Sequence, residues 1–204
     1  YKKLPYDPQA DLCPVTLEPG GKSPAVVCEG FALRTAAERI LFVKLMNAGQ
    51  ICTTVDHAWL PQAQVDDFVQ LAREIVPRRY ANLATPDYTS IIDERAFERL
   101  LAALDEARGR GAQLIQLVPG EPFDRATRKI APHIVLDAPA DCALMRREIF
   151  GPILPVRGYA SLDEVVAAIN AGDRPLAFYP FSNDASQVQM LLDRVMSGGV
   201  SVND

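Results

Sequence analysis

The chain has 204 residues, of which 49% are hydrophobic and 23% charged, and it carries a net charge of −5 at pH 7. We expect a soluble globular chain with one large core, and the acidic balance without a stripe of Lys and Arg excludes nucleic acid as a partner. No apolar run approaches the roughly 20 residues that a membrane span needs, so we expect no membrane anchor.

The cysteines and histidines indicate a reduced protein without a metal site. Four cysteines, Cys13, Cys28, Cys52 and Cys142, form no CxxC pair, and no signal peptide pattern precedes them. This usage favours a cytoplasmic setting. The two histidines lie far apart in the sequence, so we expect no metal ligation.

Residues 1–20 and residues 21–204 differ in character. The first 14 residues contain three prolines that break any helical pattern, and we interpret residues 1–20 as an irregular leader or the end of a preceding domain. From residue 21 onward, strand patterns and helix patterns alternate without an internal repeat. We therefore treat residues 21–204 as one domain.

The first part of that domain predicts two strands and two helices. Residues 24–28 form a short apolar run typical of a buried strand, and residues 57–60 are interpreted in the same way. Apolar residues recur at helical spacing over 33–46 and again over 64–76. We expect Pro77 to end the second helix.

The remaining elements continue the alternation, with caps at three helix starts. A surface loop over 78–90 precedes a helix at 94–108 capped by Asp93, Ser161 with Glu164 forms a capping box for a helix to about 170, and Asp184 caps a helix to about 196. The expected strands cover 113–118, 132–137, 153–156, 176–181 and 198–202. Alternation at this spacing predicts an α/β fold with a mostly parallel sheet flanked by helices.

One polar, glycine-bearing turn stands out, Asn47-Ala48-Gly49-Gln50-Ile51-Cys52-Thr53. It places Cys52 directly after the first predicted helix. A thiol attacks usefully at neutral pH only where a base, a dipole or exposure favours the thiolate, and a turn offers such a place. We interpret Cys52 as a nucleophile, with a small buried hydrophobe as the alternative.

Three segments together resemble the signature segments of the aldehyde dehydrogenase superfamily. They are Leu17-Glu18-Pro19-Gly20-Gly21-Lys22, Asn47 to Cys52, and Glu148-Ile149-Phe150-Gly151-Pro152, with Glu18 preceding Cys52 by 34 positions. The resemblance runs from about residue 15 to residue 204. Arg174-Pro175-Leu176-Ala177-Phe178-Tyr179 further resembles the class 3 and coniferyl aldehyde dehydrogenase branch of that family.

The resemblance implies roles for four residues. Cys52 would add to an aldehyde to give a thiohemiacetal and then a thioester, and Glu18 would act as the general base that activates water for hydrolysis. Glu148 and Phe150 match positions that contact the nicotinamide-side ribose and the nicotinamide ring of NAD or NADP. Gly20, Gly21 and Lys22 are interpreted as structural.

The resemblance also implies an aldehyde dehydrogenase catalytic domain that lacks most of the Rossmann-like cofactor domain, with residues 1–20 as the tail end of that domain. The implied partners are a small-molecule aldehyde and a second copy of the chain in a homo-oligomer. Two alternatives stay open. The chain could be a non-redox fragment in which Cys52 and Glu18 give weak thiol esterase activity, or an inactive domain retained for structure or assembly.

Overall fold

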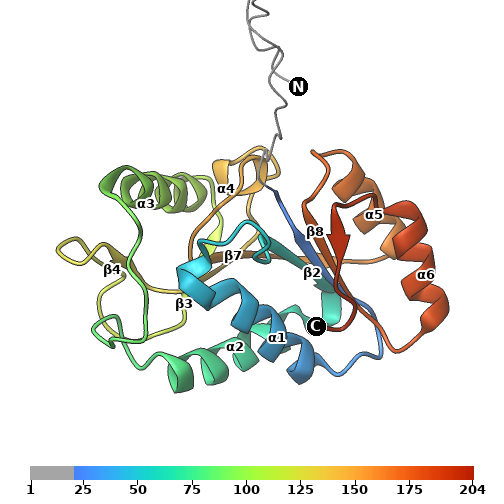
Figure 1. Ribbon diagram of the computed structural model, residues 1–204, viewed down its shortest axis with the longest axis horizontal. Coiled ribbons are helices and arrows are strands. Elements are labelled where there is room, and N and C mark those ends of the chain that lie inside the picture. The colour runs from blue at the N-terminus through green and yellow to red at the C-terminus, as the bar shows by residue number, and fades with distance from the viewer. Residues whose placement is uncertain (1–20) are drawn as a thin grey trace, which may run out of the picture.

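The computed structural model describes residues 21–204 and shows one large sheet with helices packed on both of its faces (Figure 1). Its helices are α1 (Leu33–Leu45), α2 (Val65–Arg79), α3 (Glu94–Gly109), α4 (Ala143–Arg146), α5 (Leu162–Asn170) and α6 (Ala185–Arg194), with 3₁₀ turns η1 (Met46–Gly49) and η2 (Gln62–Gln64). Its strands are β1 (Pro24–Val27), β2 (His57–Pro61), β3 (Gln113–Gln116), β4 (Phe123–Asp124), β5 (Lys129–Ile130), β6 (His133–Leu136), β7 (Ile153–Tyr159), β8 (Ala177–Phe181) and β9 (Gly199–Val200).

Seven strands form the main sheet in the order β3-β6-β7-β2-β1-β8-β9, and β4 pairs with β5 in a separate hairpin. Every neighbouring pair in the main sheet is parallel except β3 with β6. The mostly parallel α/β sheet predicted from the sequence is therefore confirmed. Strand β1 is buried along its whole length, as expected for a central parallel strand covered on both faces.

Alternating residues of the strands pack into different hydrophobic clusters. Ala25 and Val27 of β1 join the cluster formed by α1 and α2, whereas Val26 packs with residues of α5 and α6. Residues of α3 form a third cluster with Val135 of β6 and Ile153 of β7. Helices α1 and α2 thus cover one face of the sheet, and α3 with α5 and α6 covers the other.

The predicted caps form as expected. The side chains of Asp93, Ser161 and Asp184 accept hydrogen bonds from backbone N–H groups at the starts of α3, α5 and α6. The capping box of α5 differs in one contact, because the Glu164 carboxylate accepts from the N–H of Ala160 rather than from that of Ser161.

Several expected element boundaries differ from the structure, and two elements run beyond their expected ends. Helix α2 does not end at Pro77 but continues to Arg79, because a proline in the last turn removes only one N–H donor and Tyr80 N still donates to Val76 O at 2.9 Å. Strand β7 runs on to Tyr159, beyond the expected end at residue 156. The short hairpin β4–β5 and the four-residue helix α4 were not predicted.

The starts of the parallel strands bring three separate segments together. Pro24 pairs with His57, so the residues just before β1 and β2 share the amino edge of the sheet, where Asp56 N donates to Ser23 O at 2.8 Å. Residues 148–152 precede the neighbouring strand β7 and therefore reach the same edge. No helix within residues 21–204 has the length and apolarity to cross a membrane.

Candidate active site

The turn that carries Cys52 begins where α1 ends. Asn47 and Ala48 both have φ of 52° and Gly49 has φ of 76°, so three successive left-handed residues reverse the chain. Thr54 N then donates to Ile51 O at 3.0 Å, closing a turn in which Cys52 and Thr53 are central. The Cys52 thiol is unpaired and exposed, as the sequence predicted for a reactive position.

Neutral hydrogen bonds hold this turn on several sides. The buried Gln50 amide donates to Asn47 O and Ser90 O, both at 3.0 Å, and accepts from Ile92 N at 2.9 Å. At the other end of the turn, Thr54 Oγ1 donates to Val43 O at 2.9 Å. The fold therefore presents the Cys52 thiol from a well-anchored turn.

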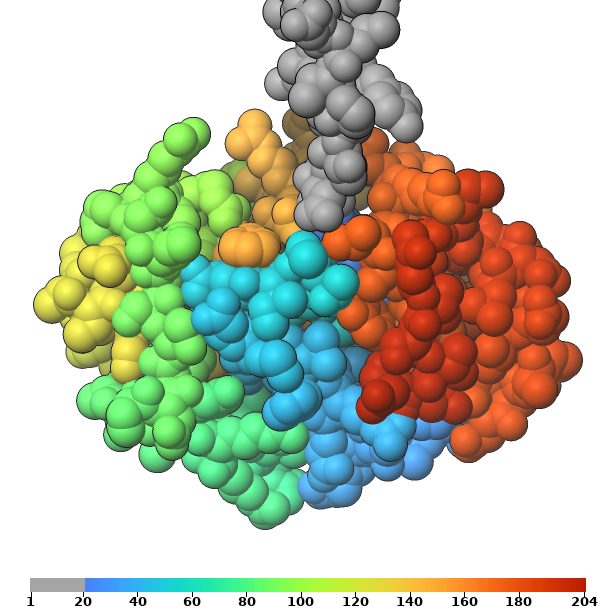
Figure 2. Space-filling model, viewed as in Figure 1, coloured from blue at the N-terminus to red at the C-terminus, as the bar shows by residue number. Residues whose placement is uncertain are grey.

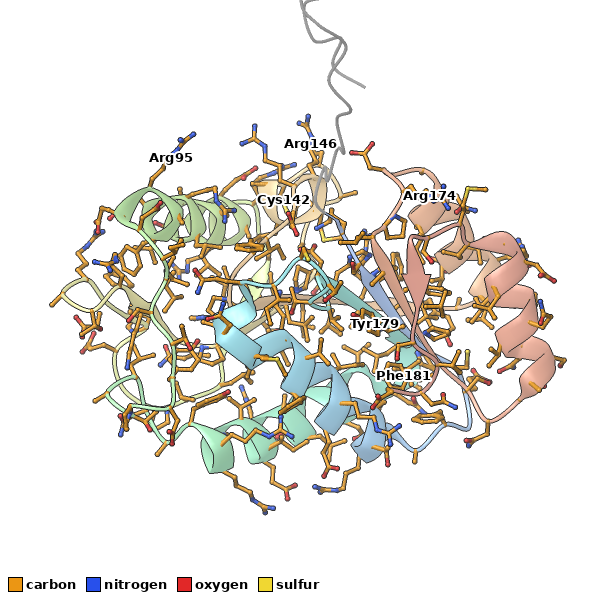
Figure 3. All side chains as sticks on the ribbon, viewed as in Figure 1. Arg95, Cys142, Arg146, Arg174, Tyr179 and Phe181 are labelled. Carbon is orange, nitrogen blue, oxygen red and sulfur yellow. The ribbon has the colours of Figure 1, made fainter. Side chains whose placement is uncertain are left out.

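Tyr179 of β8, labelled in Figure 3, anchors the turn from a distant part of the sequence. Its hydroxyl donates to the carbonyl of Thr53, the residue that follows Cys52. Burial is the main factor that raises the Tyr179 pKa, so the hydroxyl stays protonated and keeps its donor. Tyr179 belongs to the Arg174–Tyr179 segment that the sequence singled out.

The second segment, Glu148 to Pro152, links α4 to β7. Phe150 has φ of 49°, an uncommon conformation for a bulky side chain and one that concentrates at functional sites. Glu148 is half-buried, accepts a hydrogen bond from the backbone of Gly21, and has a buried Oε1 that finds no partner among the described residues. Burial raises the Glu148 pKa above its usual value, an effect that the Gly21 hydrogen bond opposes.

The two segments touch through their backbones. A Cβ atom placed on Gly49 would lie 2.3 Å from the carbonyl oxygen of Gly151, so only glycine permits this approach. In Figure 2 the cyan atoms around residue 50 reach the surface directly below the orange atoms of α4 and the residues after it. The fold thus brings the Cys52 turn and the predicted cofactor contacts, Glu148 and Phe150, to one place.

Two buried charges that the sequence did not single out, Lys44 and Asp56, lie behind this contact together with the half-buried Lys22; we call Lys22, Lys44 and Asp56 the charge cluster. The Asp56 side chain is 1% exposed, pairs with Lys22 and accepts from Ile149 N at 2.8 Å. Lys22 Nζ also donates to Leu144 O at 2.8 Å. Lys22 therefore has the structural role expected from the sequence.

Lys44 is the largest charged side chain in the core and is fully buried. Burial lowers its pKa to about 8, against the opposing attraction of Asp56. One sequence signal could have found it, because Lys44 follows Ile40 by four positions on the apolar stripe of α1. His57, next to Asp56, is also buried, which lowers its pKa to about 3 and keeps the imidazole neutral.

A cavity of about 200 Å³ opens beside Glu148 between α3 and α4. Arg99, Glu106, Arg147 and Glu148 are the charged residues of its lining, and the other lining residues are apolar. The Glu148 oxygen that has no partner among the described residues lies next to this cavity and is an acceptor that ligand hydroxyls would satisfy. This chemistry is compatible with a ligand that carries hydroxyl groups.

Two further expectations from the sequence concern the general base and a metal site. Glu18 falls outside the described residues, so no distance joins it to Cys52. Within residues 21–204, no group of three His, Cys, Asp or Glu side chains converges in a way that could hold a metal ion.

The chain is similar to several known proteins over most of its length. A probable coniferyl aldehyde dehydrogenase of Caulobacter vibrioides is 44% identical over 197 residues, which are 95% of this chain and 41% of that protein. A coniferyl aldehyde dehydrogenase of a Pseudomonas species is 42% identical with the same coverage. A substrate-bound structure of Staphylococcus aureus AldH superposes with a TM-score of 0.83 at 34% identity, covering 91% of this chain and 40% of that one.

The chain therefore spans about 40% of the length of the relatives it matches. The family model for the aldehyde dehydrogenase family matches residues 2–204, nearly the whole sequence. On this match, this chain belongs to the aldehyde dehydrogenase family.

Proposed function

We propose that this chain provides the catalytic portion of an NAD(P)-dependent aldehyde dehydrogenase, with Cys52 as nucleophile and Glu18 as general base. One observation carries the proposal. An exposed thiol on a well-anchored turn packs, through Gly49 and Gly151, against a segment whose Glu148 carboxylate has an unpartnered buried oxygen among the described residues. A nucleophile and a dinucleotide contact therefore share one edge of the sheet.

Cys52 begins the reaction. Its thiolate forms a bond to the carbonyl carbon of the aldehyde, and the carbonyl π electrons move onto oxygen to give a thiohemiacetal alkoxide. The backbone N–H of Cys52 is the donor that the turn supplies to this oxyanion. When the alkoxide collapses, the carbonyl reforms and hydride leaves carbon, giving a thioester on Cys52.

Bound NAD(P) supplies the hydride acceptor for that step. Glu148 would hold the nicotinamide-side ribose, because an ionised carboxylate accepts hydrogen bonds from both ribose hydroxyls. Phe150, whose backbone is left-handed, would offer a flat apolar wall to the ring.

Glu18 completes the cycle by accepting a proton from water. The resulting hydroxide attacks the thioester carbon, the carbon–sulfur bond breaks, and the carboxylic acid leaves while the Cys52 thiolate is regenerated. A positioned general base contributes about 10²- to 10⁴-fold to such a step.

The substrate class follows from the resemblance of this chain to coniferyl aldehyde dehydrogenases at 42–44% identity. We propose an aromatic, coniferyl-like aldehyde as substrate and a reducing, cytoplasmic setting, since Cys28, Cys52 and Cys142 are all unpaired thiols. Association into a homo-oligomer is part of the same proposal.

The direct test uses a protein that carries these segments and turns over, mixes it with NAD or NADP and coniferyl aldehyde, and follows the absorbance of the reduced cofactor. Cys52→Ser should abolish the signal, whereas Cys142→Ser, at a buried cysteine in another cluster, should keep it. Equal activity in the wild type and Cys52→Ser would show that Cys52 is not the nucleophile.

The role of Glu18 is tested by pre-steady-state kinetics in a protein that carries these segments and turns over. Glu18→Gln should leave the hydride step nearly unchanged and slow thioester hydrolysis, so a burst of reduced cofactor precedes a slow steady state. An unchanged steady-state rate would make Glu18 a structural acid.

A second function is supported by the Cys52 turn, which is complete without any cofactor contact. An exposed thiolate with a water-activating base suffices for acyl transfer, so the chain would hydrolyse an activated ester such as p-nitrophenyl acetate. Ester hydrolysis without aldehyde oxidation would favour this thiol esterase reading. Failure of both reactions would favour a structural or assembly domain.

A further inference from the structure

A second cavity, of about 270 Å³, opens between α3, the hairpin β4–β5 and the start of β6. In Figure 1 the hairpin lies beside α3 at the left of the molecule, and the rings of Phe97 in α3 and Phe123 in β4 lie 6.1 Å apart between their centres. This cavity shares only Ala102 with the cavity beside Glu148. An engineered cavity of roughly 150 Å³ in another protein binds benzene, so a molecule with one ring has room here.

Half of the lining of this cavity is apolar, and its charged side chains are already paired. The apolar residues are Leu101, Ala102, Leu104, Pro122 and Phe123. Arg125 donates to the Glu98 carboxylate, and Arg108 NH1 donates to Asp105 Oδ1 at 3.0 Å. Each guanidinium of the lining therefore has its own carboxylate, and the lining favours an uncharged ligand over an ion.

His133 is the remaining residue of the lining, and its ring projects toward α3. Side chains alternate between the two faces of a strand, and Val135, two positions after His133 in β6, packs in the cluster that α3 forms. His133 is 4% exposed. The ring of a nearly buried histidine therefore forms the inner wall of the cavity.

The backbone fixes which nitrogen of the His133 ring carries the proton. Nδ1 lies 2.6 Å from Ala131 O, and because a carbonyl oxygen only accepts, Nδ1 must be the donor. Burial is the main factor that lowers the His133 pKa below its usual value, so the ring is neutral at pH 7. Nε2 therefore keeps its lone pair and is a hydrogen-bond acceptor.

This acceptor lacks a partner in the part of the chain that the structure describes. No hydrogen bond from residues 21–204 reaches His133 Nε2, and Nε2 is not among the fully enclosed polar atoms without a partner, so it is open to the cavity. A buried polar atom is normally hydrogen-bonded. A ligand that satisfies Nε2 must supply an O–H or N–H group.

We propose that this cavity binds a small uncharged aromatic alcohol of the phenol class, whose hydroxyl donates to His133 Nε2 and whose ring packs on Phe123, Leu101 and Leu104. The apolar half of the lining suits the ring, and the open acceptor suits the hydroxyl. The inference does not depend on the proposed function, because none of these residues is assigned a role in it.

The test labels the two histidines of the 204-residue chain with ¹⁵N, and the spectrum of His57→Phe assigns the His133 signals. The probe is p-cresol, which has no aldehyde for Cys52 to attack. It should shift the Nε2 signal of His133 saturably, whereas His57, which lines neither cavity, should not respond. The ether 4-methylanisole keeps the ring but has no O–H donor, so it should bind about fivefold more weakly.

A variant of His133 tests the same hydrogen bond from the side of the protein. His133→Phe keeps a ring and removes the acceptor, so it should bind p-cresol as weakly as the wild type binds 4-methylanisole, followed through the backbone amide of Phe123. His57→Phe is the matched control and should bind p-cresol like the wild type.

The comparison of the two ligands on the wild type decides alone if His133→Phe does not fold. The absence of a saturable shift at His133 would overturn the proposal, and so would an equal shift at both histidines. Equal affinity for p-cresol and 4-methylanisole would also overturn it, because the hydroxyl would then have no partner in the cavity.

Discussion

The Cys52 turn and the Glu148 segment meet at one edge of the sheet but are held there by different forces. Neutral hydrogen bonds from Gln50, Thr54 and Tyr179 anchor the turn. The Glu148 segment is instead held by the charge cluster. Ile149 N donates to the Asp56 carboxylate, and Lys22 donates to the nearby carbonyl of Leu144. The Cys52 turn is thus held by hydrogen bonds between neutral groups, and the Glu148 segment by hydrogen bonds to charged groups.

Within one site, the contacts of the Cys52 turn are therefore expected to be independent of pH, whereas those of the Glu148 segment involve charged groups. A neutral hydrogen bond contributes about 1 kcal/mol whatever the pH, whereas a buried charge gains or loses its partner as each group titrates. Substitutions in the turn should lower the free energy of unfolding without changing its pH dependence. Substitutions in the charge cluster should change that pH dependence.

The largest effect is expected where the two segments touch. Gly49→Ala should lower the free energy of unfolding by about 3 kcal/mol, since it adds left-handed strain to a clash with the Gly151 carbonyl. Gly30→Ala is the matched control, because Gly30 has φ of +79° but open space around it, and should cost only about 1 kcal/mol. Urea denaturation measures both, and equal losses would contradict the close contact.

The charge cluster should produce a pH effect of intermediate size. Burial lowers the Lys44 pKa from 10.5 to about 8, so above pH 8 the folded amine has lost its proton while the unfolded one keeps it. The unfolded state then binds more protons, and the free energy of unfolding should rise by about 2 kcal/mol between pH 8 and pH 10. Lys44→Met should lack this rise in parallel denaturation series, and an identical pH dependence in both proteins would refute it.

A smaller effect is expected at the other end of the turn. Tyr179→Phe keeps the ring and removes the hydroxyl that donates to Thr53 O, so it should cost about 1 kcal/mol. Hydrogen exchange should show faster exchange at Thr53 and Thr54, and the pH dependence of stability should match that of the wild type. A changed pH dependence would place Tyr179 with the charges instead.

The last prediction involves no loss of stability. Iodoacetamide near neutral pH should alkylate Cys52 well ahead of Cys28 and Cys142, because Cys52 is exposed and those two cysteines are buried. Burial also raises the Cys28 pKa to about 11, which suppresses its thiolate. Peptide mapping that finds Cys28 or Cys142 modified first would argue against an accessible, reactive turn.

The fold was predictable where local signals repeat. Amphipathic stripes located α1, α2 and α3, and Asp93, Ser161 and Asp184 marked helix starts that the structure confirms. Two-residue strands such as β4 and β5 carry no periodicity, so their pairing could not be foreseen. Helix α2 continued past Pro77 because one lost donor in a last turn is a small penalty.

The candidate site was predictable only in part, since motifs mark residues and not their partners. The exposure of Cys52 in a turn agrees with expectation, and the roles of Cys52, Glu18, Glu148 and Phe150 stay predictions. Lys44 and Asp56 were missed because their meaning arises from contacts between distant segments. The one sequence signal for Lys44 was its position on the apolar stripe of α1, which indicates a buried lysine.

The position of β1 in the sheet has a consequence for how the chain folds. Strand β1 lies between β2, which follows it closely in the sequence, and β8, where Ala25 pairs with Tyr179 near the end of the chain. During synthesis, one side of β1 exposes unpaired N–H and C=O groups until β8 emerges from the ribosome. Such a long-range closure slows folding and leaves an open strand edge to be shielded meanwhile. The hydroxyl of Tyr179 reaches Thr53 only after this closure, so the Cys52 turn gains this anchor only once β8 has paired with β1.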